Sequence, residues 1–257
     1  MHEFLTEFTM FTGVEQFIII GIIVLFSQII YATIGFGSGM FAISIMAFLY
    51  GNLEFVVPFF TVLCLPTEAA ITYKDRKLIH PKSMWSFLMI IIPALLVGSL
   101  LLKNSDNDIY LIILGFIIII LALYTLIDPK KAKFSFKRFF WVPLFGSISG
   151  VIGALFGMAG PPLIFYFNHK NLSKSQFRIS LLSIFAVMTL FKLIFYTILK
   201  IITFDIVLTA LCALPFSLAG LFIGNRFHDV FPERLFKVLT SVALGISGII
   251  IIIKNLF

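Results

Sequence analysis

The sequence predicts an all-α polytopic membrane protein made of two inverted repeats, each with a re-entrant or broken glycine-containing helix pair followed by three transmembrane helices. Of the 257 residues, 60% are hydrophobic and only 12% are charged, which is about half the charged fraction of ordinary soluble domains. The mean hydropathy is +1.11. The apolar residues come in blocks that approach the ~20 residues a helix needs to cross a bilayer, and several motifs recur at one constant spacing.

Ten apolar segments follow one another along the chain, and all are expected to be helices. Stretches such as 116–121 are apolar at every position, whereas barrel strands would alternate apolar and polar residues. The expected bounds are 17–34, 39–50, 55–73, 83–102 and 109–127 in the first half, and 139–156, 161–168, 177–200, 206–224 and 235–254 in the second.

The chain is expected to divide into four parts. Residues 1–15 carry three glutamates where a signal peptide would carry basic residues, so we expect the first helix to remain in the protein. The parts are an N-terminal extracytoplasmic segment 1–16, a first transmembrane repeat 17–127, a basic cytoplasmic linker 128–138 and a second transmembrane repeat 139–257.

The two halves of the chain share features at a constant offset of 122 residues. A glycine cluster, a Pro-x4-Gly motif and a threonine each recur in the same order of segments, which chance seldom produces together. We therefore expect a duplicated half. The matched pairs are Gly35 and Gly157, Pro93 with Gly98 and Pro215 with Gly220, and Thr67 and Thr189.

The placement of Lys and Arg predicts how the halves are oriented. Cytoplasmic loops of membrane proteins concentrate these residues, and four loops here hold 15 of the 19. Placing all four in the cytoplasm makes the two repeats inverted relative to each other and puts both chain termini on the extracytoplasmic side. The four basic loops are 74–82, 128–138, 169–178 and 226–237.

Each glycine break lies between a long apolar segment and a short one. The short segments, 39–50 and 161–168, are brief for a crossing, which favours a re-entrant hairpin with the glycines near its tip. Two thin full crossings would give the same parity. A competing topology treats each pair as one long broken helix and makes the repeats parallel, but it exposes two basic loops outside, against the charge rule.

The two glycine breaks are the predicted binding site for a small anion. Glycine and proline interrupt 33–39 and 153–162, and a helix that restarts at mid-membrane presents unpaired N–H groups and a positive dipole end. The alternative is that these glycines only allow close helix packing. Their recurrence in both halves favours the site. The candidate substrate-binding residues are Thr33, Gly35, Gly37, Ser38, Gly39, Gly157, Ala159, Gly160, Pro161 and Lys192.

Polar and ionisable side chains inside the apolar segments are costly, and they usually face a cavity or a partner. Lys192 lies about 21 Å along its helix from Arg178, where it could attract an anion, pair with Glu68 or extend to the interface. Glu68 and Gln28 are candidates for coupling transport to protons, although Glu68 is near enough to Lys74 to reach the cytoplasmic interface instead.

Other classes of function find little support in the sequence. The four histidines lie at segment ends, and no Ser/His/acid set or metal-ligand spacing stands out, so no enzyme, metal site or cofactor is expected. Cys64 and Cys212 lie within apolar segments and are expected to be core residues rather than a disulfide. The net charge of +7 follows from the basic loops and requires no nucleic acid.

These motifs together resemble the sulfite exporter TauE/SafE family. The resemblance runs from about Val14 to Ile253, and it rests on the two glycine clusters, the Pro-x4-Gly helices and the Arg178-Ile179-Ser180-Leu181 start of the helix after the second cluster. It implies the transport of sulfite, an organosulfonate or a related sulfur-containing anion across the bacterial inner membrane, in the direction of export.

The residues and the resemblance lead to one hypothesis: a secondary transporter whose two hairpin tips meet at the midplane and bind a small sulfur-containing anion. Rocking of the inverted halves would then give alternating access. An anion channel of the same architecture is the main alternative, and a structural scaffold is a weaker one. The expected partners are the anion and the lipid bilayer. The driving force stays open between coupling to protons and uniport down the membrane potential, and so does the oligomeric state.

Overall fold

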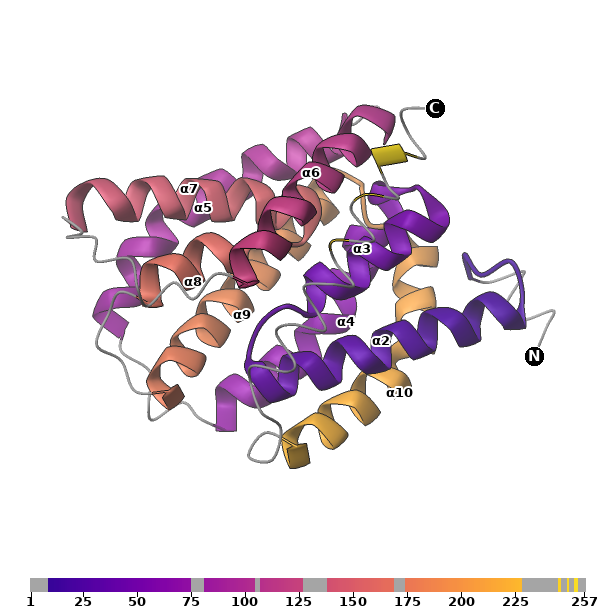
Figure 1. Cartoon of the computed structure of the whole chain (residues 1–257). Coiled ribbons are helices and arrows are strands. Elements are labelled where there is room, and N and C mark those ends of the chain that lie inside the picture. Colours follow the sequence, from indigo (N-terminus) through magenta and orange to yellow (C-terminus); the bar gives the residue numbers. More distant parts are fainter. Residues whose placement is uncertain are drawn as a thin grey trace.

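The computed structural model describes residues 9–74, 81–104, 107–126, 138–168, 174–227, 245, 249, 252 and 253, and within these it contains helices and no strands. Apolar runs of this kind form helices in a bilayer because each backbone polar group must find its partner within the membrane. The helices are α2 (Val14–Ile34), α3 (Ser38–Tyr50), α4 (Leu53–Lys74), α5 (Pro81–Lys103), α6 (Asn107–Leu126), α7 (Arg138–Phe156), α8 (Gly160–Asn168), α9 (Lys174–Ile198) and α10 (Phe204–Phe227) (Figure 1).

The helix positions confirm nine of the segments expected from the sequence. Each observed boundary lies within three residues of the expected one. The tenth expected segment, 235–254, lies outside the described residues except for isolated positions, and so do most residues of the four basic loops. The all-helical fold is therefore confirmed where it is described.

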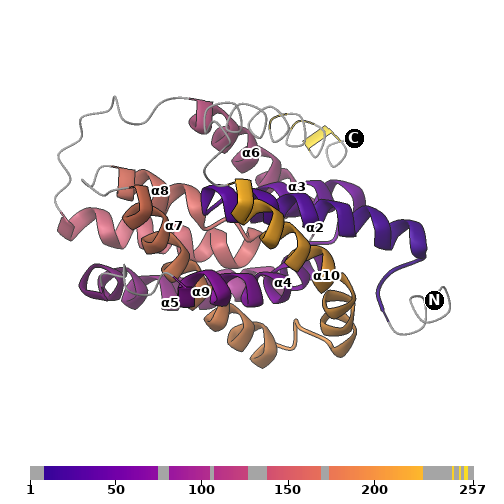
Figure 2. The ribbon, with the colours of Figure 1, turned by 90° about the horizontal axis from the view of Figure 1, so that it is seen from below.

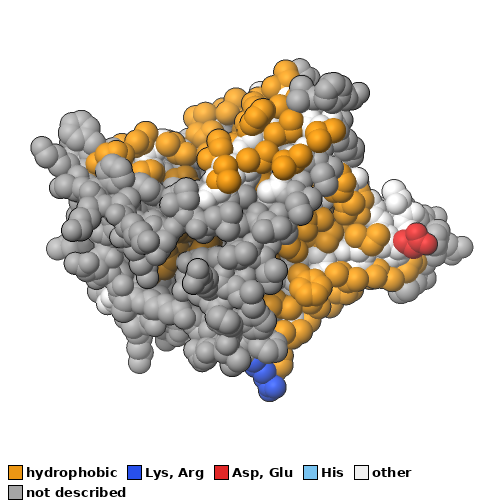
Figure 3. Space-filling view, viewed as in Figure 1, with side chains coloured by type: hydrophobic (Ala, Val, Ile, Leu, Met, Phe, Trp, Pro, Cys, Tyr) orange, Lys and Arg blue, Asp and Glu red, His pale blue; other side chains and the backbone are white. Residues whose placement is uncertain are grey.

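The surface of the molecule is that of a multi-pass membrane protein. Five helices, α2, α4, α5, α9 and α10, are long and apolar enough to cross a membrane. By contrast, α3 has 13 residues and α8 has 9, which gives lengths of about 20 and 14 Å against ~30 Å of hydrocarbon. Hydrophobic side chains cover most of the described surface in Figure 3, and charged side chains appear only at its margins.

The helices are arranged around a central crossing of α4 and α9. On one side of this crossing, α5 lies along α7 and also contacts α9; on the other, α10 lies along α2 and also contacts α4 (Figure 1). The short helix α3 packs against α2 and α4, and the short helix α8 packs against α7 and α9. Helix α6 lies at the periphery beside α3, as Figure 2 shows from below.

The Pro-x4-Gly motifs lie where helices come closest. A Cβ atom added at Gly98 of α5 would lie 2.5 Å from the Val151 carbonyl oxygen of α7. At Gly220 of α10 it would lie 2.4 Å from the Leu25 carbonyl oxygen of α2. Both distances are too short for any side chain, so these glycines permit the α5–α7 and α10–α2 crossings, as small residues commonly do between membrane helices.

Candidate functional site: a cavity between the two glycine breaks

The first break is a short turn built from glycines in the left-handed conformation. Helix α2 ends when Gly35 takes φ 92°, and the Gly35 N–H still bonds to the Tyr31 carbonyl at 2.7 Å. Gly37, also at φ 92°, then precedes the first residue of α3. Residues with a Cβ rarely adopt this conformation, which explains why glycine stands at both positions.

The second break ends α7 in the same way. Gly157 takes φ 66° directly after Phe156, and α8 begins at Gly160. Pro161 and Pro162 follow in the first turn of α8, where a helix needs no N–H from the residue. A helix of nine residues can therefore start inside the protein interior.

The two breaks touch each other. A Cβ atom at Gly39 would lie 2.3 Å from the Gly157 carbonyl oxygen, so the chain of one break passes directly against the chain of the other. A Cβ atom at Gly160 would in turn lie 4.0 Å from the Cβ of Phe36. The structure thus brings together two segments that are separated by about 120 residues in sequence.

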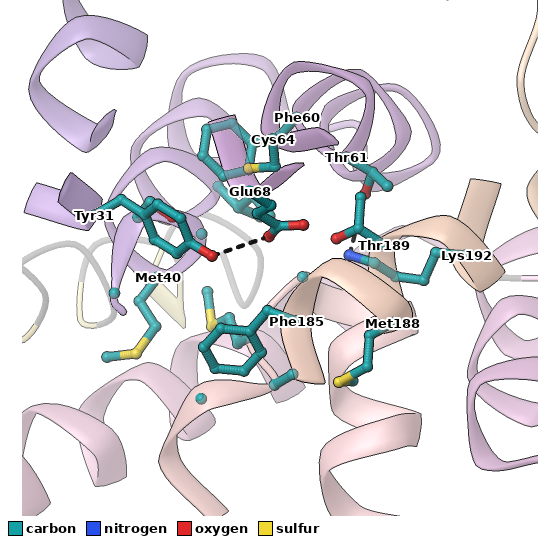
Figure 4. A pocket seen from close by; sticks show the side chains of 18 residues that line it. Tyr31, Met40, Phe60, Thr61, Cys64, Glu68, Phe185, Met188, Thr189 and Lys192 are labelled. Carbon is teal, nitrogen blue, oxygen red and sulfur yellow. Dashed lines mark hydrogen bonds between the residues drawn. The ribbon is translucent and has the colours of Figure 1, made fainter. Parts of the chain in front are cut away.

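A cavity of about 60 Å³ lies where the breaks meet α4 and α9. One water molecule requires roughly 10–15 Å³ by this measure, so the cavity has room for a few waters or a small ion. Residues of both hydrophobic cores of the molecule line it. Its lining residues are Tyr31, Gly37, Ser38, Gly39, Met40, Ile43, Phe60, Thr61, Cys64, Glu68, Gly157, Met158, Ala159, Gly160, Phe185, Met188, Thr189 and Lys192 (Figure 4).

Two side chains of opposite charge line this cavity. Glu68 of α4 is 5% exposed and Lys192 of α9 is 9% exposed, so neither extends to the membrane surface. Figure 4 shows their charged ends turned toward each other, and the hydrogen bond that Lys192 Nζ donates goes to Thr61 rather than to Glu68. Burying a charge without a close partner is expensive, which makes this pair the most conspicuous feature of the site.

The hydrogen bonds of the pair are few. Lys192 Nζ donates to Thr61 Oγ1 at 3.3 Å, and the Thr61 hydroxyl itself donates to the Val57 carbonyl at 2.8 Å. The Tyr31 hydroxyl donates to Glu68 Oε1 at 3.3 Å. Among the described residues, no group forms a hydrogen bond with Glu68 Oε2. The cavity is therefore lined by an ammonium group with one hydrogen bond and, among the described residues, by a carboxylate oxygen with none.

The start of α3 adds backbone donors. The first N–H groups of a helix have no partner inside it, and in α3 the first internal bond reaches back from Phe41 to Gly37 at 3.0 Å. No side chain caps this end. Ser38, Gly39 and Met40 all line the cavity, so this helix terminus and the buried Lys192 favour negative charge in one place.

Some predicted site residues line the cavity and others do not. The lining includes seven of the ten candidate binding residues, namely Gly37, Ser38, Gly39, Gly157, Ala159, Gly160 and Lys192, and also Glu68. Gly35 serves as the C-cap of α2. Thr33 Oγ1 bonds to the Ile29 and Gly224 carbonyls at 2.7 and 3.3 Å. Pro161 is buried in α8. Gln28 is buried beside Cys64, and the Gln28 side-chain amide donates to Cys64 Sγ at 3.7 Å.

Sequence reasoning does not select several residues of the lining. Thr61, Cys64 and Glu68 follow one another at spacings of three and four, so they share one face of α4. Phe185, Thr189 and Lys192 do the same on α9. That spacing around each buried charge is the available signal, whereas the repeat pattern marks Thr189 only as the partner of Thr67.

An all-helical membrane protein with a polar cavity between two broken helices has the form of a membrane transporter. The chain belongs to the sulfite exporter TauE/SafE family, whose model matches residues 20–251. This confirms the resemblance seen in the sequence, and membership of a family of exporters also supports the expectation that the chain is not an enzyme.

A curated relative points the same way. The chain is similar to a protein of Cupriavidus necator described as a probable sulfite/organosulfonate exporter TauE. The two are 24% identical over 220 residues, which cover 83% of this chain and 85% of the relative. No solved structure matches the chain significantly.

Proposed function

We propose that the protein is a secondary transporter that exports a small sulfur-containing oxyanion, sulfite or an organosulfonate, across the bacterial cell membrane. The observation that carries the proposal is the cavity between the two breaks, because it combines a buried ammonium group with the open end of a helix. The substrate class comes from the family and from the name of the Cupriavidus necator relative.

The anion is bound by Lys192, by the Ser38 hydroxyl and by the first N–H groups of α3. Three oxygens on one sulfur atom give such an ion several acceptors, and these donors approach the cavity from two helices, α3 and α9. The glycines of both breaks supply the space, since side chains at Gly37 or Gly160 would project toward the bound ion. Met188 and Phe185 add apolar surface to the lining, which disfavours water around the ion.

Alternating access follows from two inverted repeats. The packing of the helices supports this part of the proposal, because α5 pairs with α7 as α10 pairs with α2, and α4 meets α9. A shift of 122 residues moves α2 onto α7, α4 onto α9 and α5 onto α10. In this proposal the two halves rock about the crossing of α4 and α9 and expose the cavity to each side in turn.

The test is flux in proteoliposomes. Vesicles containing the purified protein are loaded with labelled sulfite or labelled isethionate, an organosulfonate, and efflux is compared with that of sulfate, phosphate and chloride. We expect saturable efflux of the sulfur(IV) oxyanion or the sulfonate, accelerated by the same anion outside. Saturation and counter-transport distinguish a transporter from a channel, which would instead conduct ions in large numbers.

Two lysine variants decide whether the cavity is the site. Lys192→Met keeps the length and apolar stem of the side chain but removes its charge, and it should abolish flux. Lys103→Met, at an exposed position at the end of α5, is the matched control and should transport like the wild type. Wild-type flux no higher than that of empty vesicles would refute the function, and normal flux in Lys192→Met would refute the site.

A further inference from the structure

The arrangement around Glu68 raises a question that anion binding alone does not answer. With Glu68 and Lys192 both ionised, the cavity carries no net charge before any substrate arrives. An anion beside Lys192 would then share a small, buried space with a carboxylate. Like charges in a low-dielectric interior repel strongly, so the substrate and an ionised Glu68 are poor neighbours.

The groups that face Glu68 define its surroundings. Lys192 and Thr189 lie on α9, Tyr31 lies on α2, and Cys64 lies one turn earlier on α4 itself. The described residues of α3, of the second break and of α8 that line the cavity contribute no charged side chain. Lys192 is accordingly the one cationic group that the described lining offers, and Glu68 and the substrate must compete for it.

The two carboxylate oxygens of Glu68 differ in their partners. Oε1 accepts a hydrogen bond from the Tyr31 hydroxyl at 3.3 Å, whereas Oε2 has no partner among the described residues. A buried oxygen without a partner is costly when it carries charge. A proton on Oε2 removes that charge and creates an O–H donor that can point at a neighbouring anion.

We propose that Glu68 takes up one proton on Oε2 when an anion binds beside Lys192, so that the site binds its anion and a proton together. The inference rests on the proposed function. The proton comes from solvent, and the anion replaces the Glu68 carboxylate as the counter-charge of Lys192. No other bond is made or broken. A monoanion then crosses with no net charge relative to the empty site, and a dianion crosses with one negative charge.

The experiment counts protons during anion binding. The full-length protein in detergent is titrated with methanesulfonate by calorimetry, in several buffers of equal pH but different ionisation heat. Methanesulfonate is the anion of a strong acid and takes up no proton itself, so any uptake belongs to the protein. We expect about one proton per bound anion in the wild type, and an affinity that falls about tenfold per pH unit where Glu68 is ionised in the free protein.

Two glutamate variants identify the group. Glu68→Gln mimics the protonated side chain, and it should bind methanesulfonate with no proton uptake and no pH dependence. Glu54→Gln, at the first turn of the same helix and away from the cavity, is the control and should behave like the wild type. Infrared difference spectra of the wild type give a second measurement, because a protonated carboxyl band should appear on anion addition and be absent from Glu68→Gln.

The outcomes separate this inference from the proposed function. Binding of methanesulfonate or sulfite to the wild type without proton uptake would overturn the inference alone. Proton uptake that persists in Glu68→Gln would overturn it as well. If neither anion binds the wild-type protein, the proposed function fails and the inference with it. Should Glu68→Gln not fold, absence of the carboxyl band in the wild type would still refute the inference.

Discussion

Glycines lie both at the two breaks and at the helix crossings, but their surroundings in the structure differ. At the crossings, Gly98 and Gly220 lie against backbone oxygens of the neighbouring helix. At the breaks, Gly37 and Gly160 have no atom closer than 3.5 Å to the position of an added Cβ. The first pair makes room for other parts of the protein, whereas the second pair borders a space that the protein leaves empty.

Gly39 combines both roles and thereby links the two regions. It lines the cavity, yet its missing side chain is also what allows the Gly157 carbonyl to approach. A glycine in a broken membrane helix is therefore no sufficient sign of a binding site. A short distance from the Cβ position to a neighbouring backbone atom identifies a glycine that is needed for packing, and adding single methyl groups tests this assignment.

The largest loss of stability is expected at the crossings. Gly220→Ala places a methyl 2.4 Å from the Leu25 carbonyl and 2.9 Å from the Gln28 Cβ, and the backbone of a packed helix does not move aside easily. We expect a loss of about 3 kcal/mol, at the upper end for overpacked interiors, and a similar loss for Gly98→Ala. Thermal unfolding in detergent measures it. Leu218→Ala, exposed on the same helix, is the control; equal melting of Gly220→Ala and Leu218→Ala would contradict the packing role.

Gly39→Ala should have the next largest effect on stability and should also abolish transport. Its methyl would lie 2.3 Å from the Gly157 carbonyl oxygen, but a turn can shift more easily than a helix, so we expect a loss of about 2 kcal/mol. Separating the two breaks would at the same time distort the cavity. Sulfite efflux and thermal unfolding are measured together. Normal efflux in a correctly folded Gly39→Ala protein would show that contact between the breaks is not needed for function.

Much of this arrangement can be predicted from the sequence because it depends on local chemistry. Clustered glycines, with two successive prolines in the second break, disfavour a continuous helix, so the sequence correctly locates the breaks after Ile34 and Phe156. Charged residues in apolar segments have few places to go, which makes Glu68 and Lys192 stand out by their sequence positions alone. Segment boundaries follow from length and hydropathy.

The remaining features depend on tertiary packing. Thr33 and Gly35 belong to the same sequence cluster as Gly37. However, Gly35 in its left-handed conformation is the C-cap of α2, and the Thr33 hydroxyl donates to the carbonyls of Ile29 and Gly224. Which glycines border the cavity is decided by how one break rests on the other. Equally, Thr61 lies in the site only because α4 and α9 cross with the face of α4 that carries Thr61 against the face of α9 that carries Lys192.

Gly37→Ala should cost about 1–2 kcal/mol because its φ of 92° is unfavourable for a residue with a Cβ. Gly51→Ala is a close control, since Gly51 has φ 66° and open space around its Cβ position but lies outside the cavity. Both variants should lose similar stability in thermal unfolding, and only Gly37→Ala should also lose sulfite efflux. Equal efflux in the two variants would mean that Gly37 is needed only for its backbone conformation and that it does not contact the substrate.

The smallest effect on folding is expected at Gly160, where the comparison is sharpest. An added methyl would meet Ile164 at 3.5 Å and Phe185 at 3.8 Å, which are ordinary contacts, so Gly160→Ala should change the free energy of unfolding by less than about 0.5 kcal/mol. The methyl would nevertheless occupy the cavity, and one methyl group in a fitted site typically changes recognition by about tenfold or more. We therefore expect KM for sulfite to rise roughly tenfold.

Gly160→Ser separates the effect of added volume from that of an added hydrogen bond. Position 160 matches Ser38 at the 122-residue offset, so a hydroxyl that donates to the anion should restore part of the lost transport. If both variants transport like the wild type, the second break borders the cavity without touching the substrate, and binding belongs to the α3 and α9 side alone.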